Sequence, residues 1–385
     1  MALHFERQEY SQRLQAAQKE MQQRDFAALL LFAPESHYYL TGYDTFGFAM
    51  FQCMVVPASG DPHLLTRAPD LRQAQLTSTL ADEEIHIWRD REGVEPVADL
   101  QDLLQRLDIA SGQLGIEQQT AGLNAWYGTQ INQTLGLQYD LVEATDLVAT
   151  LRRVKSPAEI EYCRRAAQLS DKALDAGIAV TQGGAFEGDI LAAMQGAVFC
   201  GGGDYAGNEF IIGSGEGALL CRYFSGRRTL DTNDQLTLEW SGAWRRYHAA
   251  MMRTLLIGKV TQQQKDMHRA AVEALEACEA AIKPGAPMGD VYSAHARVFD
   301  DHGLRHARLN ACGYGMGAVY NPIWVEFPMF YEDNPLIMQV GNVFFLHMIL
   351  MDSSTGLAMC WGHSVLVTEN GAERLSRQPL DLIAL

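Results

Sequence analysis

The chain contains 385 residues, of which 48% are hydrophobic and 20% are charged, and its formal net charge at pH 7 is -17. The surplus of acidic side chains argues against nucleic-acid binding, because no basic stripe is available to neutralise phosphates. No apolar run approaches the roughly 18 residues that a membrane-spanning helix needs, so we expect a soluble protein without membrane contact.

The first 150 residues predict a small α/β domain. An amphipathic helix is expected over residues 8–24, followed by short apolar runs that are separated by Gly and Pro turns and predict strands. The expected strands lie at 27–32, 38–40, 52–56, 63–66 and 85–88, and two later helices lie at 97–107 and 121–134.

A second domain is expected from residue 151 to residue 385. Ser156 and Glu159 form a capping-box pattern with Pro157 at the first helical position, so a helix begins there and is expected to run to about residue 179. Helices interleaved with antiparallel-looking strands predict an α+β architecture. Further helices are expected at 186–199, 262–282 and 288–302, and strands at 209–213, 235–241, 245–258, 341–350 and 361–368.

The seven cysteines are scattered and form no Cys-x-x-Cys pair, which is typical of reduced, buried thiols. The N-terminus lacks a basic start followed by an apolar stretch, so no signal peptide is predicted. We therefore expect a cytoplasmic protein.

Glu239 is the residue whose surroundings point most directly to chemistry. It interrupts an apolar strand pattern between Leu236 and Trp240, where desolvation would raise the pKa of its carboxyl group and make it a better base. Hydrolysis of an amide or amidine needs such a base, or a carboxylate nucleophile, together with donors that face the developing oxyanion. The alternative is a buried ion pair between Glu239 and Arg245 or Arg253.

A series of short motifs resembles one hydrolase family. An opening motif, Arg153-Val154-Lys155-Ser156-Pro157-Ala158-Glu159, is followed by six further landmarks in the family's order, each weak alone but specific together. They are Gly213-Ser214-Gly215, Leu238-Glu239 with Gly242, Arg253-Thr254 with Gly258, Gly313-x-Gly315-Met316-Gly317, Gly341-x-Val343-Phe344, and Val365-Leu366-Val367-Thr368-Glu369. The chain thus resembles the pita-bread (M24) hydrolases, which include methionine and Xaa-Pro aminopeptidases, prolidase, creatinase and ectoine hydrolase. The resemblance implies a pita-bread domain at 151–385 after a creatinase-like N-terminal domain at 1–150.

The metal-ligand positions of this family carry unsuitable residues here. By the resemblance, the positions that hold two aspartates, a histidine and two glutamates in the metallopeptidases are occupied by Glu239, Ala250, Tyr314, His347 and Gly362. Metal cations need several carboxylates or imidazoles at close range, so we expect no metal and no other cofactor. A single zinc ion on Glu239, His347 and His363 is the alternative that these residues leave open.

These departures resemble the metal-free branch that contains ectoine hydrolase and creatinase, whose members open C–N bonds in small zwitterions. The resemblance is carried by Arg245-Arg246-Tyr247-His248, by Cys312-Gly313-Tyr314-x-x-Gly317-x-x-Tyr320-x-Pro322-x-Trp324 and by Leu40-Thr41-Gly42-Tyr43-Asp44. It implies a homodimer with the site near the interface, a small zwitterionic or carboxylate-bearing substrate, and contacts from the N-terminal domain. Phe48 matches the aromatic contact of creatinase, whereas the matching arginine position holds Met50, so Arg67 or Arg72 is expected to replace it.

The histidine that this branch uses for proton transfer is replaced by Arg222. A guanidinium group cannot act as a base, but it can clamp a substrate carboxylate. Neighbouring Cys221 is by default a buried small residue and, if the register differs by one residue, a candidate nucleophile. Proton transfer is then assigned to His248, His347 or His363, each of which has a structural hydrogen-bonding role as its alternative.

Aromatic residues complete the expected site. Tyr314 is expected to donate to the oxyanion or, alternatively, to fill the space that a metal vacated. Tyr320 and Trp324 are assigned to substrate binding.

Three functions follow from these residues. The leading one is a metal-independent hydrolase of a C–N bond in a small charged metabolite. A non-catalytic protein that binds a small molecule or a partner on the same scaffold is the second. An Xaa-Pro aminopeptidase-type metallopeptidase is the third.

Overall fold

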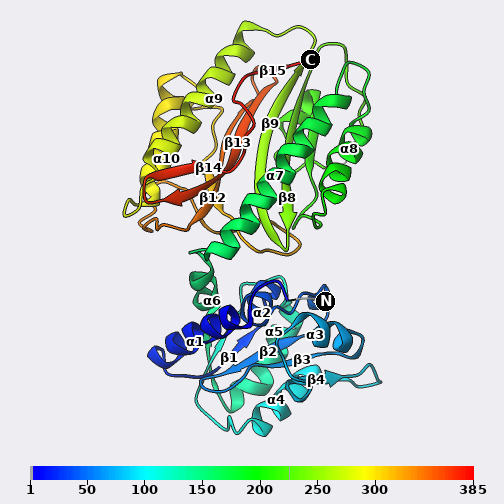
Figure 1. The fold of residues 1–385 in the computed structure, drawn as a ribbon, viewed down its shortest axis with the longest axis vertical. Coiled ribbons are helices and arrows are strands. Elements are labelled where there is room, and N and C mark those ends of the chain that lie inside the picture. The colour runs from blue at the N-terminus through cyan, green and yellow to red at the C-terminus, as the bar shows by residue number, and fades with distance from the viewer. Residues whose placement is uncertain (1–2, 225) are drawn as a thin grey trace. The chain divides into compact units, whose positions relative to one another are not determined.

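The computed structural model describes residues 3–224 and 226–385. The chain divides into two compact units, Met1–Arg152 and Arg153–Leu385, which are labelled by element in Figure 1. Among the described helices, none combines the length and the apolar character that crossing a membrane requires.

The N-terminal unit is built on a mixed six-stranded sheet in the order β4-β3-β2-β1-β5-β6. Because side chains alternate along a strand, the central strand β1 (Phe26–Leu31) supplies two separate cores, one around Leu30 and the other around Leu29 and Leu31. The other strands are β2 (Cys53–Pro57), β3 (His63–Arg67), β4 (Ile85–Trp88), β5 (Gln113–Ile116) and β6 (Asp140–Glu143). Besides α2, which is described below, the α-helices of this unit are α1 (Arg7–Gln23), α3 (Leu71–Thr77), α4 (Pro96–Arg106), α5 (Ala125–Thr134) and α6 (Thr145–Arg152).

One predicted strand of this unit is wrong. Residues 38–40 belong to helix α2 (Pro34–Thr41). Pro34 stands at the start of this helix, where its missing N–H costs no hydrogen bond. Gly42 ends the helix with a positive φ of 83°, a conformation that glycine adopts without strain. These two terminal signals outweigh the β-propensity of the tyrosines between them.

The C-terminal unit contains a nine-stranded sheet, in which β11-β10-β12-β13-β9-β8-β7 form one path while β14 pairs with β13 and β15 with β9. Its long antiparallel strands are β8 (Asp234–Trp244), β9 (Tyr247–Ile257), β12 (Val343–Asp352) and β13 (Leu357–Thr368). The short strands are β7 (Ile211–Ser214), β10 (Gly313–Gly315), β11 (Glu326–Met329), β14 (Gly371–Arg374) and β15 (Ile383–Ala384). The α+β class expected for this region is confirmed.

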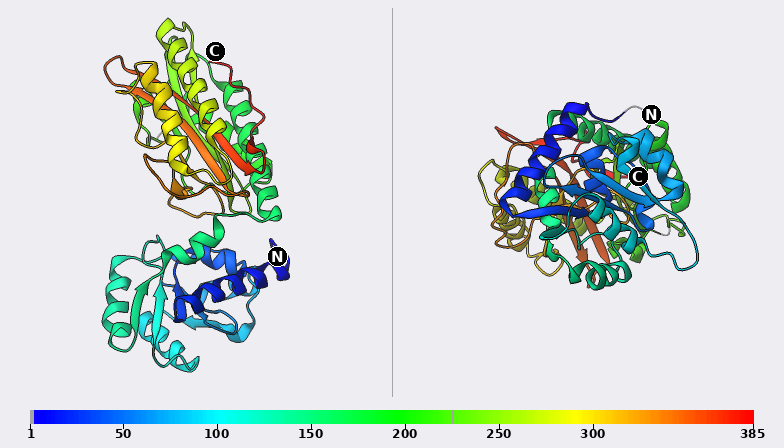
Figure 2. Two further views of the ribbon diagram at one scale, coloured as in Figure 1. Left: turned by 90° about the vertical axis from the view of Figure 1, so that its left-hand side faces the viewer. Right: turned by 90° about the horizontal axis from the view of Figure 1, so that it is seen from below.

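Four helices pack against one face of this sheet: α7 (Pro157–Val180), α8 (Glu187–Cys200), α9 (Gln262–Ala281) and α10 (Met288–Asp301). Figure 2 (left) shows α9 and α10 lying along the strands. Helix α7 begins at the predicted capping box, in which the Ser156 side chain accepts from the backbone N–H of Glu159. Trp240 of β8 anchors this helix, because its indole N–H donates to the carbonyl of Ser170 at 3.0 Å.

Strand register divides the residues of the long strands between two faces. Glu239 pairs with Met252, Met252 with Gly362, and Gly362 with His347. Directly paired residues point to the same side of a sheet, so these four positions form one row on what we call the Glu239 face. Their sequence neighbours point to the opposite side, the helix face, which α7 and α9 cover.

Candidate active site

Glu239 lies in the middle of β8, on the Glu239 face, with 7% of its surface exposed. Burial raises the pKa of its carboxyl group from the ordinary value of 4.5 to about 7, opposed by a hydrogen bond from Tyr314 and by the positive charge of Arg222. The carboxyl group therefore titrates near neutral pH, as a general base must.

Tyr314 and Trp324 hold one oxygen of this carboxylate. The Tyr314 hydroxyl donates to Oε1 of Glu239 at 3.2 Å and accepts a hydrogen bond from Nε1 of Trp324 at 2.8 Å. The hydroxyl hydrogen is thus directed to Glu239, so the expected role of Tyr314 as an oxyanion donor is not supported. No other hydrogen bond to Glu239 is found among residues 3–224 and 226–385, which leaves Oε2 available.

His347 is the predicted histidine that the fold brings beside this network. It lies on the Glu239 face, and its ring centroid is 5.5 Å from that of Tyr314. Burial lowers the pKa of His347 to about 4, so the imidazole is neutral at pH 7 and can accept a proton. Its Nδ1 is buried without a hydrogen-bond partner in the described part of the chain.

Arg222 and Cys221 precede β8 in a segment that follows a 3-10 helix (Gly215–Leu219). Arg222 is exposed, and its positive charge lowers the pKa of both Glu239 and Tyr314. The half-buried Cys221 has its Sγ 3.3 Å from Sδ of Met351. Burial and the charge of Glu239 raise the pKa of this thiol, so its environment does not favour the nucleophilic thiolate.

Two predicted catalytic histidines have ring nitrogens that bind groups other than Glu239. His363 points to the helix face, where its Nε2 lies 2.6 Å from Oε1 of Glu279 on α9. In His248, Nδ1 bonds the carbonyl of Arg246 at 2.7 Å and Nε2 accepts from the backbone N–H of Gly207 at 2.9 Å. Because the backbone occupies both ring nitrogens of His248, the structural alternative holds for this residue. The catalytic prediction for His363 is wrong, because its side chain lies on the opposite face of the sheet.

Two further predictions for the site concern aromatic residues. Trp324 is 1% exposed and supports Tyr314, so its assignment to substrate contact is wrong. Tyr320 is buried, with the guanidinium group of Arg246 4.9 Å from its ring centroid, and its assignment to substrate binding stays a prediction.

The predicted ion pair of Glu239 is absent in the described part of the chain. Arg245 donates to the Tyr162 hydroxyl. Arg253 lies on the helix face, where it donates to the Gly362 carbonyl at 2.6 Å and stands over the Trp361 ring.

The predicted contacts from the N-terminal unit stay predictions. Phe48 is buried and stacks edge-on against Phe46 at 5.5 Å. Arg67 is half-buried and forms an ion pair with Asp90 at 3.0 Å. Met50 is 49% exposed, and Arg72 is also exposed.

Two buried residues that interact electrostatically with site residues were not predicted from the sequence. Cys360 lies on the Glu239 face of β13, and its thiol pKa is raised by burial and by the charges of Cys221 and Glu239. Period-two alternation from Gly362 would have found it. His295 on α10 is buried, and neither ring nitrogen has a partner within the described residues. Burial and the neighbouring His347 lower its pKa to about 3; no sequence pattern indicated it.

A dinuclear metal centre does not fit these side chains. Of the five family ligand positions, Ala250 and Gly362 supply no donor atom, and a side chain at Gly362 would clash with the Leu346 carbonyl oxygen. The alternative of one zinc ion is wrong, because His363 faces away from Glu239 and His347. Within residues 3–224 and 226–385, no group of three or more His, Cys, Asp or Glu side chains is arranged to hold a metal ion.

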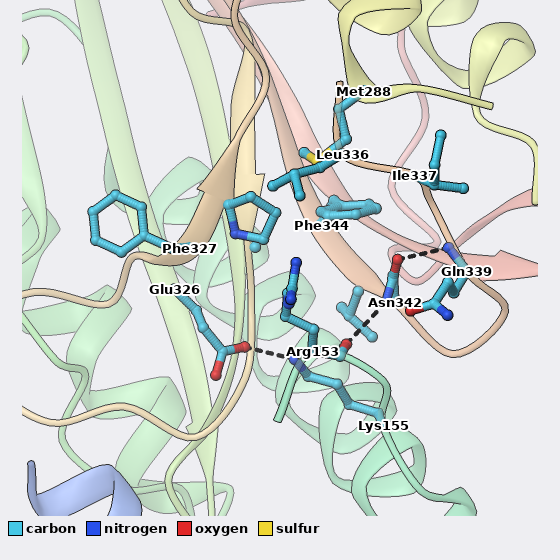
Figure 3. A pocket seen from close by; sticks show the side chains of 13 residues that line it. Arg153, Lys155, Met288, Glu326, Phe327, Leu336, Ile337, Gln339, Asn342 and Phe344 are labelled. Atoms are coloured by element: carbon cyan, nitrogen blue, oxygen red, sulfur yellow. Dashed lines mark hydrogen bonds and ion pairs between the residues drawn. The ribbon is translucent and has the colours of Figure 1, made fainter. Parts of the chain in front are cut away.

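A separate cavity lies at the edge of the sheet and is shown in Figure 3. Its lining includes Phe344 on the helix face and the ion pair of Lys155 with Glu326, whose atoms are 2.5 Å apart and buried. Since Gly315 of β10 pairs with Phe344, the sheet separates this cavity from the Tyr314 side chain. The ion pair ties the start of α7 to β11 and takes no part in the Glu239 site.

Comparison with known proteins gives this geometry a family context. Residues 161–369 match metallopeptidase family M24, and residues 13–154 match the creatinase/prolidase N-terminal domain. An uncharacterised hydrolase/peptidase of Sinorhizobium fredii is 29% identical over 394 residues, covering 99% of this chain and 98% of the relative. Ectoine hydrolase of Halomonas elongata is 26% identical over 402 residues, with the same coverage.

A solved structure shows the same fold across the whole chain. Dipeptidase PepE from Mycobacterium ulcerans superimposes with a TM-score of 0.84 at 25% identity and covers 99% of both chains. The expected pita-bread fold with a creatinase-type N-terminal domain is thereby confirmed. Because the M24 match spans more than half of the sequence, the chain belongs to metallopeptidase family M24, a family of hydrolases.

Proposed function

We propose that this protein is a metal-independent hydrolase that opens a C–N bond, in an amide, amidine or cyclic amidine, of a small charged metabolite. The observation that carries the proposal is the state of Glu239. Its carboxyl group is buried and titrates near pH 7, and one oxygen is held by Tyr314. It stands among former ligand positions that no longer offer a cage for cations. The similarity to ectoine hydrolase supports the same reaction class.

Glu239 is the base or the nucleophile in this proposal. As a base, Oε2 takes a proton from a water molecule, whose oxygen then attacks the carbon of the C–N bond. As a nucleophile, Oε2 attacks that carbon directly and water releases the product afterwards. A pKa near 7 leaves a substantial fraction of the carboxyl group ionised at neutral pH, as both routes require.

His347 is proposed to relay a proton: it takes up, through Glu239, the proton that the attacking water releases, and it passes this proton to the leaving nitrogen as the C–N bond breaks. Its imidazole is neutral at pH 7 and lies beside Tyr314, 5.5 Å between ring centroids. Of the three histidines predicted for this task, it is the one on the Glu239 face whose ring nitrogens are not both bound to the backbone. The low pKa suits a group that is protonated only transiently.

Arg222 is proposed to bind a carboxylate of the substrate. It is exposed, and its positive charge lowers the pKa of Glu239 and of Tyr314. Guanidinium groups bind carboxylates in a bidentate geometry. We further propose a cytoplasmic homodimer in which Phe48 and Arg67 of the partner subunit complete the pocket. Arg67 would exchange its ion pair with Asp90, a surface pair of low stability, for the substrate carboxylate.

Incubation of the EDTA-treated protein with a panel of amidine, lactam, acyl-diamine and Xaa-Pro compounds, followed by mass spectrometry, tests this proposal. We expect turnover of a carboxylate-bearing C–N substrate, and Glu239→Gln to lose about 10²–10⁴-fold in rate. Glu216→Gln, which changes an exposed carboxylate of the same unit, serves as the control. Full activity of Glu239→Gln would remove its role. Activity that appears only after manganese, cobalt or zinc is added would overturn metal independence.

A binding protein without catalysis is the second candidate, and one observation favours it. The family's proton-transferring histidine is replaced by Arg222, and position 362 is closed to a side chain. Saturable binding of a panel compound without any product, measured by calorimetry and mass spectrometry together, would support this function instead.

A further inference from the structure

The Tyr314 hydroxyl joins two segments of the C-terminal unit. Trp324 Nε1 lies 2.8 Å from the phenolic oxygen, and that oxygen lies 3.2 Å from Oε1 of Glu239. An indole N–H can only donate, and a phenol has one hydrogen. The phenolic oxygen must therefore accept from Trp324, and its single hydrogen must point to Glu239.

Trp324 is itself held in place. Its side chain is 1% exposed, and its backbone N–H donates to Oδ1 of Asn208 at 3.1 Å. Tyr314 packs edge-on against Phe345, with ring centroids 5.4 Å apart. The indole and the phenol are thus fixed by contacts outside Glu239, so their order along the network does not depend on a bound substrate.

We propose that Trp324 is a positioning residue: it commits the Tyr314 hydrogen to Oε1 of Glu239 and leaves Oε2 as the oxygen that meets water or substrate. The inference deepens the proposed function and rests on it for the identity of the reacting group. Without the indole N–H, the phenolic oxygen is free to accept a hydrogen from protonated Glu239. The network then stabilises the neutral acid instead of the carboxylate. The oxyanion must be stabilised by a donor other than Tyr314.

The other titratable or charged groups around Glu239 keep their chemical identity in a Trp324 variant. They are Arg222 and Cys221 before β8, Cys360 on β13, Tyr314 on β10 and His347 on β12. A change in the titration of Glu239 in a Trp324 variant is therefore assigned to the hydroxyl of Tyr314.

The test compares Trp324→Phe, Tyr314→Phe and the double variant by carboxyl-carbon NMR titration of Glu239 in the full chain, with pH–rate profiles on any panel substrate. Trp361→Phe is the matched control. That indole is also fully buried, lies on the helix face, and has an Nε1 without a hydrogen-bond partner among the described residues. We expect both single variants to raise the pKa of Glu239 by about one unit, the equivalent of one hydrogen bond to a charged group. The double variant should have the same pKa of Glu239 as Tyr314→Phe alone, because Trp324 acts through Tyr314.

An unshifted titration in Trp324→Phe overturns the inference, and so do shifts that add in the double variant. If Trp361→Phe shifted the pKa of Glu239 by the same amount, the shift would be due to a general loosening of the fold. That result would also overturn the inference. The outcomes separate this inference from the proposed function. The expected shifts in a protein that turns over no panel compound support the positioning role and count against hydrolysis. Turnover with an unshifted Trp324→Phe profile supports hydrolysis and refutes the positioning role.

Discussion

The buried carboxyl group of Glu239 makes the stability of the C-terminal unit depend on pH, and the Glu239→Gln variant isolates this effect. Burial raises the pKa from 4.5 to about 7 in the folded state, so the folded protein binds this proton more tightly than the unfolded chain does. Below pH 4.5 the group is protonated in both states and costs nothing. As pH rises through 7, the folded state must hold a buried carboxylate, and stability is lost. A shift of about 2.5 units at 1.36 kcal/mol per unit corresponds to about 3 kcal/mol.

Chemical denaturation at a series of pH values between 4.5 and 8.5 measures this difference. Four of the six tryptophans (240, 244, 324 and 361) belong to the C-terminal unit, so their fluorescence reports its unfolding. The free energy of unfolding of Glu239→Gln minus that of the unmodified protein should grow by about 3 kcal/mol from the acidic to the basic end of the series. Glu216→Gln, on an exposed side chain, should show no such growth. A pH-independent difference for Glu239→Gln would refute the assignment of a raised pKa and, with it, the base assigned to the reaction.

Three further changes test the geometry of the site. Gly362→Ala should lower the free energy of unfolding by roughly 1–3 kcal/mol, because the added Cβ meets the Leu346 carbonyl oxygen. The control Gly196→Ala, in open space on α8, should instead stabilise the protein by about 0.5–1 kcal/mol. Thermal unfolding measures both changes. Arg222→Gln should raise KM for a carboxylate-bearing substrate roughly ten- to hundredfold while kcat changes less; an unchanged KM contradicts the clamp. His363→Gln should cost about 1–2 kcal/mol of stability through the lost bond to α9 but leave kcat intact; a large fall in kcat would restore His363 to the catalytic set.

Local sequence signals predicted helix ends and buried strands that neighbouring residues in the sequence determine. The capping box at Ser156 fixed the start of α7, and the apolar run around Glu239 predicted both the strand and the buried acid. Strands β5 and β6 were missed because each spans four residues with few β-branched side chains. The tyrosines of α2 favour a strand by propensity, whereas Pro34 and Gly42 at its two ends specify a helix.

The predicted site was less accurate because it depends on contacts that no local pattern contains. His363 illustrates an error that the sequence could have avoided: it follows Gly362 directly, and period-two alternation sends neighbouring strand residues to opposite faces. The bond from Trp324 to Tyr314 is different. It depends on how the loop after β10 returns to the sheet and on the support from Asn208, 116 positions earlier in the chain.

The charges at the family's ligand positions fit the proposed absence of metal. In the metallopeptidase pattern, four carboxylates are neutralised by two divalent cations. If the cations alone were lost, four buried negative charges would face one another, a costly arrangement in a medium of low polarity. This chain has one acid at these positions, Glu239, whose pKa is about 7. The positive charge of Arg222 lowers this pKa, and Glu239 accepts a hydrogen bond from Tyr314. Ala250 lies diagonally across the strand pair from it, and Gly362 lies in the same row. An acid restored at position 250 alone would face Glu239 without a cation and raise the pKa of both groups. A single buried acid thus fits the proposed reaction without metal, and burial places its pKa near 7, where a hydrolytic base is useful.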